Sequence, residues 1–119
     1  MRKWIACGGN VIDGDVVCWP EPIWKEKGKR KKTLVKIGIR LMTASVTGLE
    51  GKVWVHLSVL ECVIKDIQQA KPLTPLRKGE RLKRKRSTLA RGEAQRLAWA
   101  GADGEAARAL AISKFMGSR

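Results

Sequence analysis

Residues 53–59, VWVHLSV, alternate apolar and polar side chains with a period of two residues. Three valines and a leucine fall on one face, and Trp54, His56 and Ser58 fall on the other. Because successive side chains of a strand point to opposite sides of a sheet, this pattern predicts a half-buried β-strand. A chain of 119 residues with a hydrophobic fraction of 44% is long and apolar enough to build a core against the apolar face.

Further β-like segments lie before and after this strand. Residues 16–19, 34–41 and 62–65 are rich in β-branched and other apolar side chains, with a turn signal at Asp13-Gly14 before the first segment and another at residues 48–51 after the second. The two prolines that follow residue 19 restrict their segment to a sheet edge or a bend. About five short strands in fewer than 70 residues favour a small, highly curved antiparallel barrel, because closure removes exposed strand edges.

The order of these segments resembles that of an SH3-like small barrel. The resemblance covers residues 11–66 and rests on GDVVCW at 14–19, VKIGIRLMTASV at 35–46, VWVHLSV at 53–59 and CVIK at 62–65. SH3-like modules include proteins that bind nucleic acids and proteins that bind peptides, so the resemblance implies a fold and leaves both partners open. Signalling SH3 domains use tyrosine-rich motifs of their own to bind proline-rich peptides. This chain contains no tyrosine, which argues against the peptide-binding alternative.

The composition changes after residue 70. Prolines within residues 71–76 indicate a linker, and the chain from Thr88 onward is rich in residues that favour helices. We expect one helix over residues 88–100 and a second from about Glu105 to Met116. The expected fold class is mainly β with a helical C-terminal extension. Its three parts are an SH3-like β-barrel over 1–70, a Pro-containing basic linker over 71–86 and one or two helices over 87–119.

Positive charge is concentrated in two runs, KEKGKRKK at residues 25–32 and RKGERLKRKR at residues 77–86. The formal net charge of the chain is +14. Residues 71–119 contain 13 basic and 4 acidic side chains, whereas the longer stretch 1–70 contains 12 and 7. Clustered lysines and arginines attract polyanions, and that attraction weakens steeply with salt. We therefore expect a nucleic acid, DNA or RNA, as the partner.

The candidate nucleic-acid-binding residues are the basic side chains of the two runs and two tryptophans beside them. Trp24 borders the first run, and Trp54 lies on the polar face of the central strand, so either ring could stack on a base or fill the core. On a nascent helix, one face would carry Arg77, Arg81, Arg84 and Lys85, which follow a three- and four-residue spacing. The full set is Lys25, Lys27, Lys29, Arg30, Lys31, Lys32, Arg77, Lys78, Arg81, Lys83, Arg84, Lys85, Arg86, Trp24 and Trp54.

Catalysis and metal binding find little support in the sequence. The three cysteines and His56 lack the paired spacing of a zinc site, and the chain has neither a P-loop nor a GxGxxG motif. Asp13 and Asp15 could hold a metal, but a hairpin turn also accounts for them. We expect a protein without metal or cofactor that is not an enzyme, with a small metal-dependent nuclease as a weaker alternative.

The remaining expectations concern compartment and partners. Three cysteines without framework spacing indicate a reducing cytoplasm. The longest nearly uncharged stretch, 41–49, is far shorter than the roughly 20 residues of a membrane span, and we expect no signal peptide. A compact basic protein suits an accessory role in a phage, a plasmid or an RNA–protein assembly. The alternative is a protein–protein interaction module or inhibitor that docks on an acidic partner surface through its helical tail.

Overall fold

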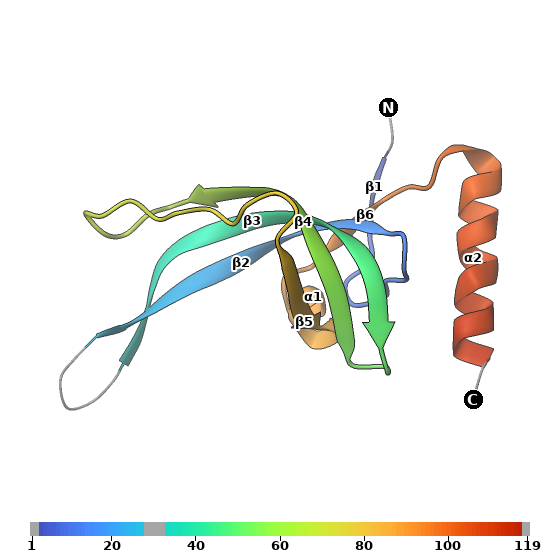
Figure 1. Cartoon of the computed structure of the whole chain (residues 1–119), viewed down its shortest axis with the longest axis horizontal. Coiled ribbons are helices and arrows are strands. Elements are labelled where there is room, and N and C mark those ends of the chain that lie inside the picture. The colour runs from blue at the N-terminus through green and yellow to red at the C-terminus, as the bar shows by residue number, and fades with distance from the viewer. Residues whose placement is uncertain (1–2, 28–32, 118–119) are drawn as a thin grey trace.

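The three long strands form where β-branched and other apolar side chains recur in the sequence, and shorter elements precede and follow them (Figure 1). The structure is a computed structural model, and it describes residues 3–27 and 33–117. Its elements, in chain order, are β1 (Trp4–Ala6), β2 (Val16–Lys27), β3 (Thr33–Glu50), β4 (Trp54–Lys65), β5 (Arg81–Lys85), α1 (Arg86–Arg91), β6 (Gln95–Leu97) and α2 (Gly101–Gly117). The strand expected at 53–59 is confirmed over residues 54–59 of β4, where Val55, Leu57 and Val59 are buried, whereas Val53 lies in the preceding turn and is exposed.

The strands form one antiparallel sheet with the order β1-β6-β2-β3-β4-β5. The central strand β3 pairs with β2 along one side and with β4 along the other. Within the described part of the chain, β1 and β5 are the two edges, so the sheet is open and a closed barrel is not confirmed. The coarser prediction of a mainly β protein with helices near the C-terminus is confirmed.

The sheet is strongly curled even though it is open. Glu21 of β2 and Arg84 of β5 form a bidentate ion pair with distances of 2.9 and 3.0 Å, although β3 and β4 lie between their strands. In a flat sheet, strands separated by two others are about 14 Å apart, so the sheet must bend to bring this pair together. Register shifts, which bend strands, occur at Ile23/Trp24, Thr43/Ala44 and Val46/Gly48.

The core lies on the concave side of the curled sheet. It includes Val17, Trp19, Met42, Ala44, Val46, Val55, Leu57, Val59, Leu89 and Ala94. Full burial of a valine, leucine or methionine side chain in this core contributes about 1.5–3 kcal/mol to the free energy of folding. Leu89 comes from α1, so this short helix, which lies between β5 and β6 in the chain, contributes a fully buried side chain to the core.

The prediction of one helix over residues 88–100 is wrong beyond Arg91. The helix α1 ends there, Glu93 takes a left-handed backbone conformation with φ of 51°, and the following residues form β6. The hydrogen bonds of β6 to β1 and β2 outweigh the helix propensity of its residues. The second predicted helix is confirmed and begins earlier, at Gly101. Over the described residues, neither helix has the length and apolarity that crossing a membrane requires.

A buried ion pair attaches α2 to the segment before β2. Arg108 of α2 donates to Asp15 through Nε at 2.8 Å and through Nη2 at 2.7 Å, and both residues are buried. The indole N–H of Trp99 donates to Asp15 Oδ1 at 2.8 Å, and the backbone N–H of Ile12 donates to Oδ2 at 2.9 Å. The carboxylate is therefore fully satisfied, and this charged contact anchors α2 to the segment before β2.

Candidate nucleic-acid interface

Two of the predicted binding groups meet on the outer face of β4 and β5. In the antiparallel register, Trp54 lies opposite Lys85 and His56 lies opposite Lys83, so each pair shares a face. The β4 residues between them are buried in the core, which means that this face points outward. We refer to Trp54, His56, Arg81, Lys83 and Lys85 as the β4–β5 strip.

Two ammonium groups lie over the ring of Trp54. Lys83 Nζ is 4.7 Å from the ring centroid and Lys85 Nζ is 5.4 Å from it, both within cation–π range. Lys83 also donates to Glu50 at 2.6 Å, and its hydrogen bond and charge hold the pKa of Glu50 below the usual value. Among the described residues, no carboxylate pairs with Arg81 or Lys85, so the strip keeps unneutralised positive charge.

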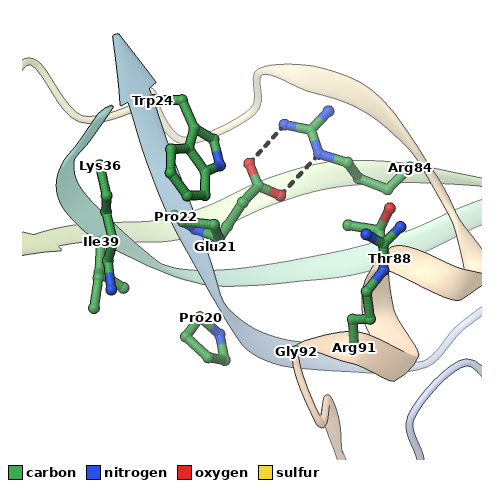
Figure 2. A pocket seen from close by; sticks show the side chains of 10 residues that line it. All are labelled: Pro20, Glu21, Pro22, Trp24, Lys36, Ile39, Arg84, Thr88, Arg91 and Gly92. Carbon is green, nitrogen blue, oxygen red and sulfur yellow. Dashed lines mark hydrogen bonds and ion pairs between the residues drawn. The ribbon is translucent and has the colours of Figure 1, made fainter. Parts of the chain in front are cut away.

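A hollow of about 680 Å³ lies at the edge of β2 that β6 leaves uncovered (Figure 2). Among the described residues, β6 pairs with β2 only at Val17 and Cys18. Pro20 and Pro22 lie beyond that point, where β2 pairs with β3 alone, as their missing N–H groups require. The hollow is lined by Pro20, Glu21, Pro22, Trp24, Lys36, Ile39, Arg84, Thr88, Arg91 and Gly92.

Trp24 forms one wall of this hollow. Its side chain is 54% exposed, and it lies opposite Lys36 of β3 in the register. The register shift between Ile23 and Trp24 falls at this point, and such a shift changes the direction in which a side chain leaves its strand. Of the two readings that the sequence allowed for this ring, core or contact surface, the structure places it outside the core.

The ion pair of Glu21 with Arg84 forms a second wall, and Arg40 holds the same carboxylate from outside the lining of the hollow. Glu21 accepts hydrogen bonds from Arg84, from Arg40 Nη2 at 2.8 Å and from the Trp19 indole N–H at 3.2 Å. Burial by itself raises the pKa of Glu21, but the hydrogen bonds and charge of Arg84, the hydrogen bond of Trp19 and the charge of Arg40 hold this pKa below its usual value. The pair is therefore charged near neutral pH, and its guanidinium is fixed in place (Figure 2).

Lys36 and Arg91 add positive charge to the rim of the hollow. Lys36 comes from β3 and Arg91 from the end of α1, and Figure 2 shows them on different sides of the hollow. Both side chains are exposed, and the described residues contain no ion pair to either of them. Because Glu21 is already neutralised by two arginines, an anionic ligand would meet a net positive rim.

The residues predicted from the second basic run separate into outward and inward groups. Arg77 and Lys78 are exposed in the turn before β5, and the outward side chains of β5 belong to the strip. Arg84 instead holds Glu21 inside the curl, and Arg86 Nη1 donates to the carbonyl oxygens of Gly9 at 2.7 Å and of Val11 at 3.1 Å. The helical face considered for this run does not form, because residues 81–85 are a strand.

Of the first basic run, Lys25 is exposed on β2. Lys29, Arg30, Lys31 and Lys32, and the side chain of Lys27, lie outside the described residues. Sequence reasoning missed Lys36 and Arg91, which are single charges outside both runs. Only the pairing of Lys36 with Trp24 could have identified the first, and nothing local marks the second.

The residues considered for metal binding or catalysis are dispersed. Asp15 is buried in the anchor of α2, whereas Asp13 is exposed. His56 lies on the strip, with Nε2 3.6 Å from Glu50. The three cysteines are free thiols, and burial raises the pKa of Cys7 to about 11. Within the described residues, no group of three or more His, Cys, Asp or Glu side chains could hold a metal ion.

Comparison of this chain with protein-family models, with curated proteins and with solved structures finds no match. The class that the structure itself defines is an open, curled antiparallel sheet with two helices near the C-terminus. Its functional interpretation therefore rests on the β4–β5 strip and on the hollow beside Trp24.

Proposed function

We propose that this protein binds nucleic acid, either DNA or RNA, through the phosphate backbone and without catalysing a reaction on it. The main support is the β4–β5 strip, in which Arg81, Lys83 and Lys85 lie on one face of one strand. Alternate residues of a strand are about 6.7 Å apart, a separation comparable with that of successive phosphates along a nucleic-acid chain. Backbone contacts carry little base information, so we expect modest sequence specificity.

Trp54 gives the strip a second means of contact. Its ring lies under Lys83 and Lys85, so a phosphate that draws the ammonium groups toward itself leaves the ring face for a neighbouring base. Aromatic faces combined with basic groups are the usual surface of proteins that follow a nucleic-acid strand. The net charge of +14 adds long-range attraction to the same partner.

The same proposal includes the fold relationship, the compartment and the biological role of the protein. The bent β3 strand and the short α1 helix between β5 and β6 support an SH3-like relationship for a sheet that curls without closing. Free thiols at all three cysteines support the cytoplasm as the compartment. An accessory role in a phage, a plasmid or an RNA–protein assembly suits a small basic protein of this kind.

The second candidate function is docking on an acidic protein surface. Leu110 of α2 is 60% exposed, which favours a contact through this helix. Such a complex should persist at higher salt and weaken when Leu110 is replaced by alanine, because apolar contacts are not screened. Binding that vanishes steeply with salt and ignores Leu110→Ala would favour nucleic acid instead.

Replacing Arg81, Lys83 and Lys85 together with glutamine is expected to weaken binding to DNA and RNA alike. The slope of log affinity against log salt is negative, and each lost phosphate contact makes it shallower by about 0.7–0.9, so we expect it to become shallower by about 2–3 in the triple variant. Fluorescence anisotropy of labelled oligonucleotides over a salt series measures this slope.

A matched control removes the same charge from exposed lysines elsewhere, by changing Lys3, Lys65 and Lys71 to glutamine. This control should keep most of the slope if the strip is the contact surface. An equal loss in both triple variants would show that net charge alone attracts the polymer, and would contradict the assignment of the strip.

A further inference from the structure

We infer that the hollow beside Trp24 holds one unpaired base of a nucleic-acid strand, so that the preferred partner of this protein is single-stranded. This inference rests on the proposed function and adds a site to it. Trp24 is the stacking surface, and Lys36 and Arg91 are the groups that meet the adjoining phosphates. The β4–β5 strip then contacts mainly the backbone, while the hollow holds an unpaired base.

The position of Trp24 is the first argument. A tryptophan that is 54% exposed contributes little to the core, yet here it stands at a register shift and forms a wall of a concave site. The volume of about 680 Å³ falls within the range of small-molecule sites, roughly 300–1,000 Å³. A flat aromatic ligand can therefore enter beside the indole and stack on it.

The charges of the hollow are the second argument. The one carboxylate that lines it, Glu21, is held by Arg84 and Arg40, which leaves Lys36 and Arg91 as rim cations without a carboxylate partner among the described residues. A ligand that fits the hollow thus has an aromatic ring that stacks on Trp24 and negatively charged groups that face the rim cations. A nucleotide within a strand has this combination.

The concave shape of the site excludes a base within a duplex, and the prolines at its edge disfavour a peptide that adds a strand. A base inside a duplex is stacked and paired, so it cannot enter a concave site unless it leaves the helix. A peptide that adds a strand to this edge would need backbone N–H donors, and Pro20 and Pro22 have none. The hollow therefore favours a strand whose bases are already unstacked.

The test compares oligothymidylate with an abasic deoxyribose-phosphate oligomer of the same length. The two polymers carry the same charge, and only the first has bases. We expect the wild-type protein to bind oligothymidylate roughly tenfold more tightly than the abasic oligomer, and Trp24→Ala to remove most of this difference while leaving abasic binding unchanged. Trp24→Phe should keep part of the difference, and Trp4→Ala, which removes an exposed tryptophan of β1, should keep all of it.

Each outcome decides between the two proposals. If the wild-type protein binds both polymers equally, or if Trp24→Ala weakens both to the same extent, the base site is overturned while backbone binding stands. If neither polymer binds at low salt, the proposed function fails and the base site falls with it. If a proline-rich peptide displaces oligothymidylate and its own binding is lost in Trp24→Ala, the hollow is a peptide site and the inference is wrong. Because Trp24 is exposed, we expect the Trp24 variants to have the same melting temperature as the wild-type protein.

Discussion

Asp15→Ala is expected to lower the free energy of unfolding by about 3–5 kcal/mol, the range found when one partner of a buried ion pair is removed. The variant leaves the Arg108 guanidinium buried without its counter-ion. It also removes the acceptor of the Trp99 indole N–H and of the Ile12 backbone N–H. Urea unfolding followed by circular dichroism measures the change.

The reciprocal variant, Arg108→Ala, should cost less. It leaves Asp15 with two of its donors, Trp99 and Ile12, whereas Asp15→Ala removes the acceptor of all four hydrogen bonds and leaves Arg108 only its bond to the Asn10 carbonyl oxygen at 3.1 Å. A double-mutant cycle between Asp15 and Arg108 isolates the pair itself. Asp13→Ala is the matched control, because this aspartate is exposed and its loss should change stability by less than about 0.5 kcal/mol. If Asp15→Ala is as mild as the control, packing rather than the ion pair holds α2 in place.

The parts of the fold that could be predicted are those encoded in short stretches of sequence. The alternation of residues 53–59 requires one buried face, and Val55, Leu57 and Val59 provide it in β4. The prolines after residue 19 lie on an uncovered edge, as their missing N–H groups demand. The helix α2 follows from a run of good helix formers.

What could not be predicted depends on partners far away in the sequence. Arg84 belongs to a run of charges in which nothing local distinguishes it from Lys83 or Lys85, yet it turns inward because Glu21, 63 residues earlier, lies across the curl. The strand β6 likewise forms only because β1 and β2 offer it hydrogen bonds. In the candidate site, the tryptophans and the outward lysines were predicted, whereas Lys36 and Arg91 required the folded geometry.

Glu21→Gln is expected to lower the free energy of unfolding near neutral pH by about 3 kcal/mol, the low end of the range for breaking a buried ion pair. The low end applies because the side chains of Arg40 and Arg84 are 25% and 26% exposed, so water partly solvates them once the charge is gone. Glutamine keeps the volume of the side chain, so the loss reports on charge. Glu61→Gln, on the exposed side of β4, is the control and should be nearly neutral.

The same variant tests the pH dependence of stability. The pKa of Glu21 is lower in the folded protein than in the unfolded chain, where a glutamate has a pKa of about 4.3. Its contribution is therefore present above that unfolded value and is lost as the pH falls through the folded pKa. We expect the difference in stability between the wild type and Glu21→Gln to be largest near neutral pH and to shrink below about pH 4. Glu105, whose pKa the Arg96 hydrogen bond lowers to about 2, is common to both proteins and cancels in this difference.

A comparison of Glu21→Gln with Trp24→Ala distinguishes a change in the shape of the hollow from the loss of its stacking surface. Without the carboxylate charge, Arg84 loses the bond that draws β5 toward β2, so the preference for oligothymidylate over the abasic oligomer should decrease together with stability. Trp24→Ala should reduce that preference without any loss of stability, because the ring lies outside the core. If Glu21→Gln unfolds at the same urea concentration as the wild-type protein, core packing alone holds the curl. In that case the fold would place Arg84 in the wall of the hollow, and its ion pair with Glu21 would not be what curls the sheet.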